Sequence, residues 1–231
     1  MNTYKSIKVI AFDADDTLWV NETYYREAEQ KFMKLLSPYE TKNKIDQELF
    51  KTEMKNLHLY GYGIKSFVLS MIQTALELSN YRVDTKTIEK IIRIGKEMLE
   101  KPLELLDDVE LTLKTLQPKY KLILATKGDL LDQERKLKKS GLGKYFHHIE
   151  ILSDKKTENY QSLLDRLEIK KSEFLMVGNS LKSDVLPLLK IGTQAIHIPF
   201  HTTWIHEEVK DHQNNGDYRS FTRLKDILTY L

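Results

Sequence analysis

The chain has 231 residues, which suits one large domain or a core with a smaller insert. Apolar residues make up 41% of the sequence and charges of both signs are plentiful, so a packed globular protein is expected rather than a disordered one. The formal net charge of +2 argues against a protein that binds nucleic acid through bulk charge, and the absence of cysteine excludes disulfides and thiol catalysis. No apolar run approaches the roughly eighteen residues that span a bilayer, and the first one is too short for a signal peptide. We therefore expect a soluble cytoplasmic protein that binds neither membranes nor nucleic acid.

The first predicted element is a strand at residues 7–12 (IKVIAF), a short apolar run rich in β-branched side chains. It ends in a cluster of carboxylates. From about residue 22 the pattern changes to helical periodicity, interrupted by Pro38, the Gly61–Gly63 link and residues 80–84. The predicted helices are Thr23–Leu36, Lys44–Leu57, Ile64–Leu78 and Thr85–Leu99. This part of the chain is expected to form an antiparallel helical bundle.

After Pro102 the sequence alternates between helical and strand patterns. The predicted strands are 121–126, 149–152, 173–177 and 194–198, and the predicted helices are 108–116, 130–139, 157–167 and 184–190. Such alternation is typical of βαβ units and predicts an α/β fold with a Rossmann-like parallel sheet. Because the first strand is separated from the others, we predict an α/β core formed by residues 1–18 and 103–231, with a helical insert at 19–102.

Polar residues follow each of the first four predicted strands. Asp13 and Asp15 come after the first, Thr126 and Lys127 after the second, Lys155 past the third, and Asn179 and Asp184 past the fourth. The carboxyl ends of parallel strands meet at one edge of a sheet, where open α/β sheets bind ligands. Carboxylates, a hydroxyl and lysines at one edge suit phosphoryl transfer assisted by a divalent metal.

The four segments DADDT, Thr126, Lys155 and GNSLKSD, each near a strand end and in this order, resemble the four motifs of haloacid dehalogenase superfamily hydrolases. The resemblance covers the whole α/β part, and the helical insert resembles the C1 cap of that superfamily. It implies a cap that closes over small substrates. It also implies a phosphatase, because dehalogenases and phosphonatases of the superfamily lack an acid at the position of Asp15.

The resemblance also implies a role for each motif residue. Asp13 would attack phosphorus and form an aspartyl-phosphate, and Asp15 would act as general acid and base. Thr126 and the backbone amide of Lys127 would hold the phosphate oxygens of a small phosphate ester, and Lys155 would balance the charge of Asp13 and of the phosphoryl group. The expected cofactor is Mg²⁺, and its expected ligands are Asp13, the Asp15 carbonyl, Asn179 and Asp184.

Two residues depart from the family pattern. Asn179 stands where an aspartate is usual, so one expected metal ligand is a neutral amide, which would weaken Mg²⁺ binding. Lys156 stands where proline is common, which leaves two candidate lysines; we favour Lys155 because it lies nearer the strand end.

A phosphomutase and a catalytically weak ligand-binding relative remain alternatives, whereas the insert and Thr126 disfavour a receiver-like phospho-acceptor domain. The oligomeric state is not predicted.

Several other polar residues are interpreted as structural. Asp16 is expected in a turn or cap, Asp129 at the start of a helix, and Arg135–Lys139 on a solvated helix face. His197, His201 and His206 could form a zinc site, but no helix or ligand turn supports one, so strand-end and loop histidines are favoured. Their segment is expected at the rim of the site.

Overall fold

The computed structural model describes residues 6–210 and 212–231, which form two compact units. Among these described residues, the first unit comprises 6–22, 103–127 and 133–231. The second comprises Thr23–Pro102 and Gly128–Asp132. The predicted division placed residues 19–22 in the insert and 128–132 in the core, whereas the two units have them the other way round. The predicted domain boundaries stay a prediction.

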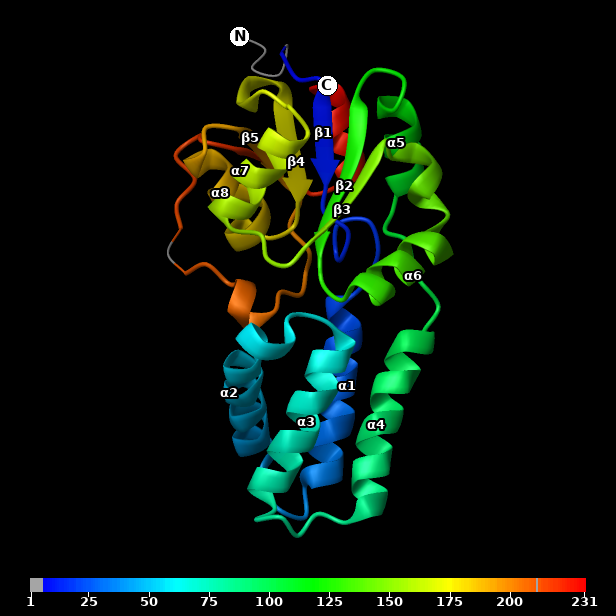
Figure 1. Cartoon of the computed structure of the whole chain (residues 1–231), viewed down its shortest axis with the longest axis vertical. Coiled ribbons are helices and arrows are strands. Elements are labelled where there is room, and N and C mark those ends of the chain that lie inside the picture. The colour runs from blue at the N-terminus through cyan, green and yellow to red at the C-terminus, as the bar shows by residue number, and fades with distance from the viewer. Residues whose placement is uncertain (1–5, 211) are drawn as a thin grey trace. The chain divides into compact units, whose positions relative to one another are not determined.

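A parallel sheet of six strands forms the centre of the first unit (Figure 1), in the order β3-β2-β1-β4-β5-β6. The strands are β1 (Val9–Phe12), β2 (Lys121–Lys127), β3 (His148–Leu152), β4 (Phe174–Gly178), β5 (Gln194–His197) and β6 (Arg219–Ser220). The α/β fold is therefore confirmed. β6 was not predicted, because it has two exposed polar residues and no apolar pattern.

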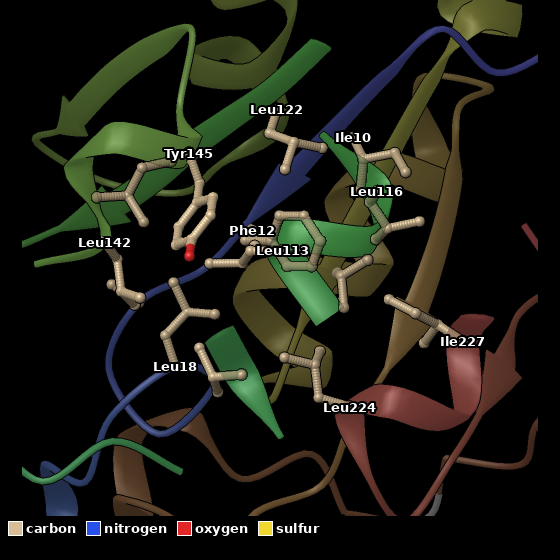
Figure 2. Close-up of a cluster of buried hydrophobic side chains, with 14 of the residues drawn as sticks. Ile10, Phe12, Leu18, Leu113, Leu116, Leu122, Leu142, Tyr145, Leu224 and Ile227 are labelled. Carbon is tan, nitrogen blue, oxygen red and sulfur yellow. The ribbon is translucent and has the colours of Figure 1, made fainter. Parts of the chain in front are cut away.

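The buried residues of the strands alternate between two apolar clusters, one on each face of the sheet. Ile10 and Phe12 of β1 belong to a cluster that includes Leu113 and Leu116 (Figure 2). Val9 and Ala11 belong to the opposite cluster. Sheets buried on both faces need apolar residues at every strand position, which explains the continuous runs in the sequence.

Helices of the first unit cover these faces. They are α5 (Val109–Leu116), α6 (Leu130–Ser140), α7 (Thr157–Arg166) and α8 (Leu186–Lys190). A π-helical turn at Leu181–Val185 precedes α8, so the regular helix begins two residues later than predicted. Pro187 lies in the first turn of α8, where its missing N–H costs no hydrogen bond.

The second unit contains α1 (Glu22–Leu36), α2 (Lys42–Tyr60), α3 (Ile64–Leu78) and α4 (Thr85–Glu100), which share an apolar core. Thr41 caps α2 and Asp84 caps α4 through side-chain oxygens. Gly61 and Gly63, between α2 and α3, have φ angles of 70° and 110°, a backbone conformation that favours glycine. No helix in residues 6–210 and 212–231 is long and apolar enough to cross a membrane.

Candidate active site

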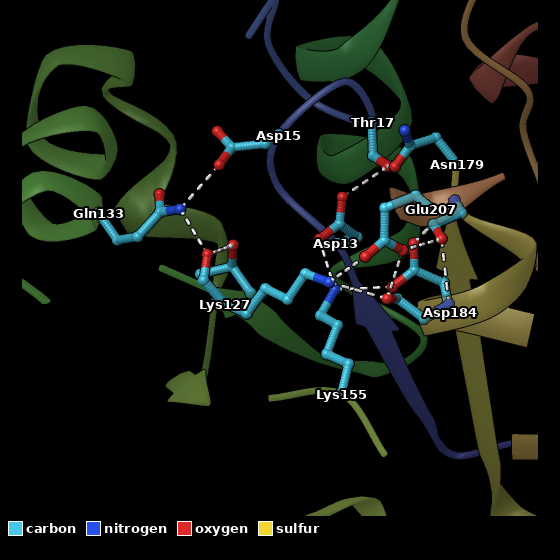
Figure 3. Close-up of polar contacts among 12 residues, drawn as sticks. Asp13, Asp15, Thr17, Lys127, Gln133, Lys155, Asn179, Asp184 and Glu207 are labelled. Carbon is cyan, nitrogen blue, oxygen red and sulfur yellow. Dashed lines mark hydrogen bonds and ion pairs between the residues drawn. The ribbon is translucent and has the colours of Figure 1, made fainter. Parts of the chain in front are cut away.

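A buried ion-pair cluster lies where β1, β3 and β4 end. The Lys155 ammonium donates to Asp13 Oδ1 at 2.5 Å and to Asp184 Oδ1 at 2.7 Å (Figure 3). The Lys155 side chain is 1% exposed. Lys156, the alternative lysine, is 72% exposed and pairs with Asp154 at 2.9 Å. The structure thus places Lys155, and not Lys156, against the predicted nucleophile.

The charges of this cluster do not balance. Burial raises the pKa of Asp13, Lys155 lowers it and Asp184 raises it again, with a net value of about 7. Burial alone lowers the pKa of Lys155, but Asp13 and Asp184 outweigh burial and hold it well above its ordinary value. When both carboxyls are ionised, two negative charges surround one positive charge. A further cation would stabilise this arrangement.

Gly178, at the end of β4, permits the approach of Asp184. A Cβ atom on Gly178 would lie 2.4 Å from the Asp184 carboxyl carbon, so any side chain there would push Asp184 away. The Ser180 backbone N–H donates to Asp184 Oδ2 at 3.0 Å and fixes the carboxylate. The glycine of the GNS segment is therefore required by packing.

The Asn179 amide faces the first loop. With its nitrogen turned toward this loop, the amide donates to Thr17 Oγ1, Asp13 Oδ2 and the Asp15 carbonyl, each at 3.2 Å. With its oxygen turned there, Asn179 accepts from Thr17 Oγ1 at 3.2 Å and its oxygen also faces Asp13 Oδ2 and the Asp15 carbonyl, an arrangement that a shared cation would make favourable. Neighbouring ligands of Mg²⁺ lie roughly 3 Å apart, given metal–oxygen distances of about 2.1 Å. The residues present therefore fit a magnesium ion.

The Asp15 side chain points away from Asp13 and toward α6 (Figure 3). It accepts hydrogen bonds from Trp19 Nε1 at 2.7 Å, Gln133 Nε2 at 2.8 Å and Lys136 Nζ at 2.9 Å. Burial raises the pKa of Asp15, but the Lys136 charge and these three hydrogen bonds outweigh it, so that the net pKa is lowered. Asp15 is held as a carboxylate.

Gln133 and Lys136 were not predicted as site residues. Lys136 was assigned to a solvated helix face, yet its side chain is only 16% exposed and it contacts Asp15. Gln133 and Lys136 are three residues apart on α6 and therefore share a face. This spacing is the sequence pattern from which their joint contact with another segment could have been predicted.

Thr126 is buried at the end of β2, and its hydroxyl makes one long hydrogen bond of 3.4 Å to the Lys127 carbonyl. Lys127 Nζ donates to Glu207 Oε1 at 2.5 Å and to Ser183 Oγ at 2.9 Å. Glu207 was not predicted, because it lies in an irregular segment after β5. The structure brings Lys127 beside the segment that contains Asn179 and Asp184.

Asp16 and Asp129, which were interpreted as structural, occupy structural positions. Asp16 has a φ of 62° and accepts hydrogen bonds from the N–H groups of Asn21 and Glu22, so it is a turn and capping residue. Asp129 accepts from the Asp132 N–H at 3.1 Å in the first turn of α6, as a helix cap does.

The three histidines do not form a zinc site. His197 contacts the Asn179 carbonyl, His201 contacts Thr202, and His206 packs on Trp204. Within residues 6–210 and 212–231, no three His, Cys, Asp or Glu side chains are grouped to hold a metal. A cation at Asp13 would instead use the Asp15 carbonyl and an amide.

Comparisons with known proteins define the family. A family model for haloacid dehalogenase-like hydrolases matches residues 7–192. A haloacid dehalogenase-like family hydrolase from Xanthomonas campestris is 34% identical with a TM-score of 0.83, over 97% of this chain and 96% of that chain. The chain therefore belongs to the haloacid dehalogenase-like hydrolases, and it is an enzyme of that family, as its motifs predicted.

More distant structures share the fold. The putative hydrolase YfnB from Bacillus subtilis, described with bound magnesium, is 17% identical with a TM-score of 0.65, over 97% of this chain and 98% of that chain. A 2-haloacid dehalogenase from Pseudomonas syringae is 18% identical with a TM-score of 0.64, over 97% of each chain. Others at similar identity are described as phosphatases. No curated protein matches the sequence.

Proposed function

We propose that this hydrolase is a Mg²⁺-dependent phosphatase that cleaves a small phosphorylated metabolite through an aspartyl-phosphate on Asp13. The observation that supports the proposal most directly is that the two oxygens of the Asp13 carboxylate have different surroundings. Oδ1 is ion-paired to Lys155, and Oδ2 faces the oxygens of a candidate cation site. A nucleophilic carboxylate that attacks a phosphate dianion needs this neutralisation of charge.

Mg²⁺, held by Asp13, the Asp15 carbonyl and Asn179 with Asp184 nearby, would neutralise charge on the phosphoryl oxygens. Lys155, whose ammonium is also held by Asp184, orients the Asp13 carboxylate. Asp13 then forms a bond to phosphorus while the bond between phosphorus and the ester oxygen breaks. Thr126 and Lys127 are proposed to bind the phosphoryl oxygens.

Asp15 supplies and removes the protons. Its protonated form gives a proton to the departing alkoxide, which leaves as an alcohol. Its carboxylate then takes a proton from the water that attacks phosphorus, while the bond between phosphorus and the Asp13 oxygen breaks, so that inorganic phosphate leaves and the Asp13 carboxylate is regenerated. With three donors around it, Asp15 lies in the form that accepts a proton. Proton donation would require the side chain to leave Lys136 and Gln133.

Asp15 also favours the phosphatase over a dehalogenase. A departing halide needs no proton, so an acid that protonates a leaving group has no role in dehalogenation. Residues 19–102 are proposed to act as the cap that excludes water during the transfer. The partner of this site is proposed to be a small phosphate ester.

Release of phosphate from a panel of metabolite phosphomonoesters tests the proposal, measured with and without Mg²⁺ for the wild type and Asp13→Asn. Halide release from 2-haloacids is measured in parallel. Mg²⁺-dependent phosphate release that the variant lacks supports the phosphatase. Halide release without phosphate release supports a dehalogenase. Folded protein with neither activity points to the binding relative, and isomerisation with a bisphosphate activator points to a mutase.

A further inference from the structure

Glu207 is a nearly buried carboxylate that the proposed chemistry does not use. It ends a 3₁₀ turn at Ile205–Glu207, in the segment between β5 and β6, and its side chain is 11% exposed. Oε1 accepts from Lys127 at 2.5 Å. Oε2 accepts from the hydroxyls of Ser180 and Ser183, each at 2.5 Å.

These contacts form a closed ring. Lys127 Nζ donates to Glu207 and to Ser183, and Ser183 in turn donates to Glu207. Lys127 is the residue after Thr126, while Ser180 and Ser183 adjoin Asn179 and Asp184 in the chain. Glu207 therefore binds two of the segments that carry the proposed phosphate and metal ligands (Figure 3).

The charge of this pair is balanced. The Lys127 side chain is 16% exposed and that of Glu207 is 11% exposed, so water screens their charges weakly. Burial raises the pKa of Glu207, but Lys127 and the three hydrogen bonds outweigh it and lower the pKa to about 2. At neutral pH the pair is an ammonium and a carboxylate with no net charge.

A lysine beside a phosphate site has two opposing effects. It stabilises charge on the transferred phosphoryl group, but it also binds the product phosphate, which must leave before the next turnover. A carboxylate paired with that lysine removes its net charge while keeping its ammonium in a fixed position.

Resting on the proposed phosphatase function, we propose that Glu207 is a positioning residue that acts through Lys127. It fixes the Lys127 ammonium for the phosphoryl group and cancels its net charge, so that inorganic phosphate is released. A purely structural role for Glu207 would instead join the two segments without affecting anion affinity through charge.

A series of variants separates these roles by charge. The Lys127–Glu207 pair has no net charge in the wild type, a charge of +1 in Glu207→Gln, −1 in Lys127→Met and none in the double variant. The probe is inorganic phosphate, titrated by calorimetry in the presence of Mg²⁺. Glu208→Gln, an exposed change of the same charge on the next residue, is the control.

We expect Glu207→Gln to bind phosphate about fivefold more tightly and Lys127→Met to bind it about fivefold more weakly, with the double variant between them. Turnover of the best phosphomonoester should fall in Glu207→Gln while its KM does not rise. Glu208→Gln should behave as the wild type. Thermal unfolding of each variant verifies the fold, and Glu207→Asp, which keeps the carboxylate, should restore part of the wild-type behaviour.

Weaker phosphate binding by Glu207→Gln, or a double variant as weak as Lys127→Met, would overturn the proposal. Unchanged phosphate binding in Glu207→Gln would overturn it too. These outcomes leave the phosphatase function intact if the wild type binds phosphate. Wild-type protein that binds no phosphate and hydrolyses no ester would overturn both.

Discussion

Lys136 Nζ lies 2.9 Å from Asp15 Oδ1, and this ion pair favours the carboxylate form of the proposed general acid. Lys136 also donates to Asn21 Oδ1 at 2.8 Å, so the ammonium is held from two sides. Its charge is the largest of the effects that lower the pKa of Asp15 against burial. The protonation chemistry proposed for the first loop thus depends on a residue of α6.

Lys136→Met should raise the pKa of Asp15, because the positive charge is lost while burial remains. Formation of the aspartyl-phosphate needs protonated Asp15, so the limb of the kcat/KM profile on which Asp15 loses its proton should move to higher pH. A phosphomonoester with a poor leaving group is the suitable substrate. Lys138→Met, an exposed change on the same helix, should leave the profile unchanged. An unmoved limb in Lys136→Met would show that Lys136 does not tune Asp15.

Lys155→Met should abolish turnover and destabilise the protein. It leaves Asp13 and Asp184 buried without their shared counter-ion, and such a loss costs about 3–5 kcal/mol. The matched variant Lys156→Met removes an ammonium that is 72% exposed and should change the free energy of unfolding by less than about 1 kcal/mol. Urea unfolding and phosphate release measure both. Similar effects of the two substitutions would contradict the assignment of Lys155 to the site.

The sequence predicted the sheet because its central strands are buried on both faces and are therefore apolar throughout. It also predicted the convergence of Asp13, Lys155 and Asp184, which follow strands that end at one edge. Whether Lys155 or Lys156 faces inward could not be read from two adjacent lysines, since it depends on the path of the chain after β3.

Residues outside the strand ends were harder to predict. Gln133 and Lys136 lie on a polar helix, and only tertiary packing decides which of its faces meets the first loop. Glu207 lies in a segment with no periodicity, so no pattern indicated that its carboxylate is nearly buried. Each of these contacts joins residues more than 70 positions apart in the sequence.

Asn179→Asp should bind Mg²⁺ about tenfold more tightly, because a carboxylate replaces a neutral amide oxygen among the proposed ligands. Without Mg²⁺ the variant should unfold at a lower temperature than the wild type, since a further negative charge would join Asp13 and Asp184. The increase in unfolding temperature on adding Mg²⁺ measures both effects. Asn215→Asp, an exposed substitution with the same charge change, should match the wild type. An identical Mg²⁺ response in Asn179→Asp would show that this position is not a ligand.

The ion pair of Glu207 with Lys127 should make the stability of the metal-free protein depend on pH. The pKa of Glu207 is lowered from 4.5 to about 2, so its contribution is complete above pH 4.5 and is lost as the pH falls toward 2. The full contribution is on the order of 3 kcal/mol. We therefore expect the difference in unfolding free energy between wild type and Glu207→Gln to be largest near neutral pH and to shrink below pH 4.5. Urea unfolding in EDTA between about pH 3 and pH 7 measures this difference, with Glu208→Gln as the control. A difference that stays constant across the range would mean that the Glu207 carboxylate is not stabilised in the folded state.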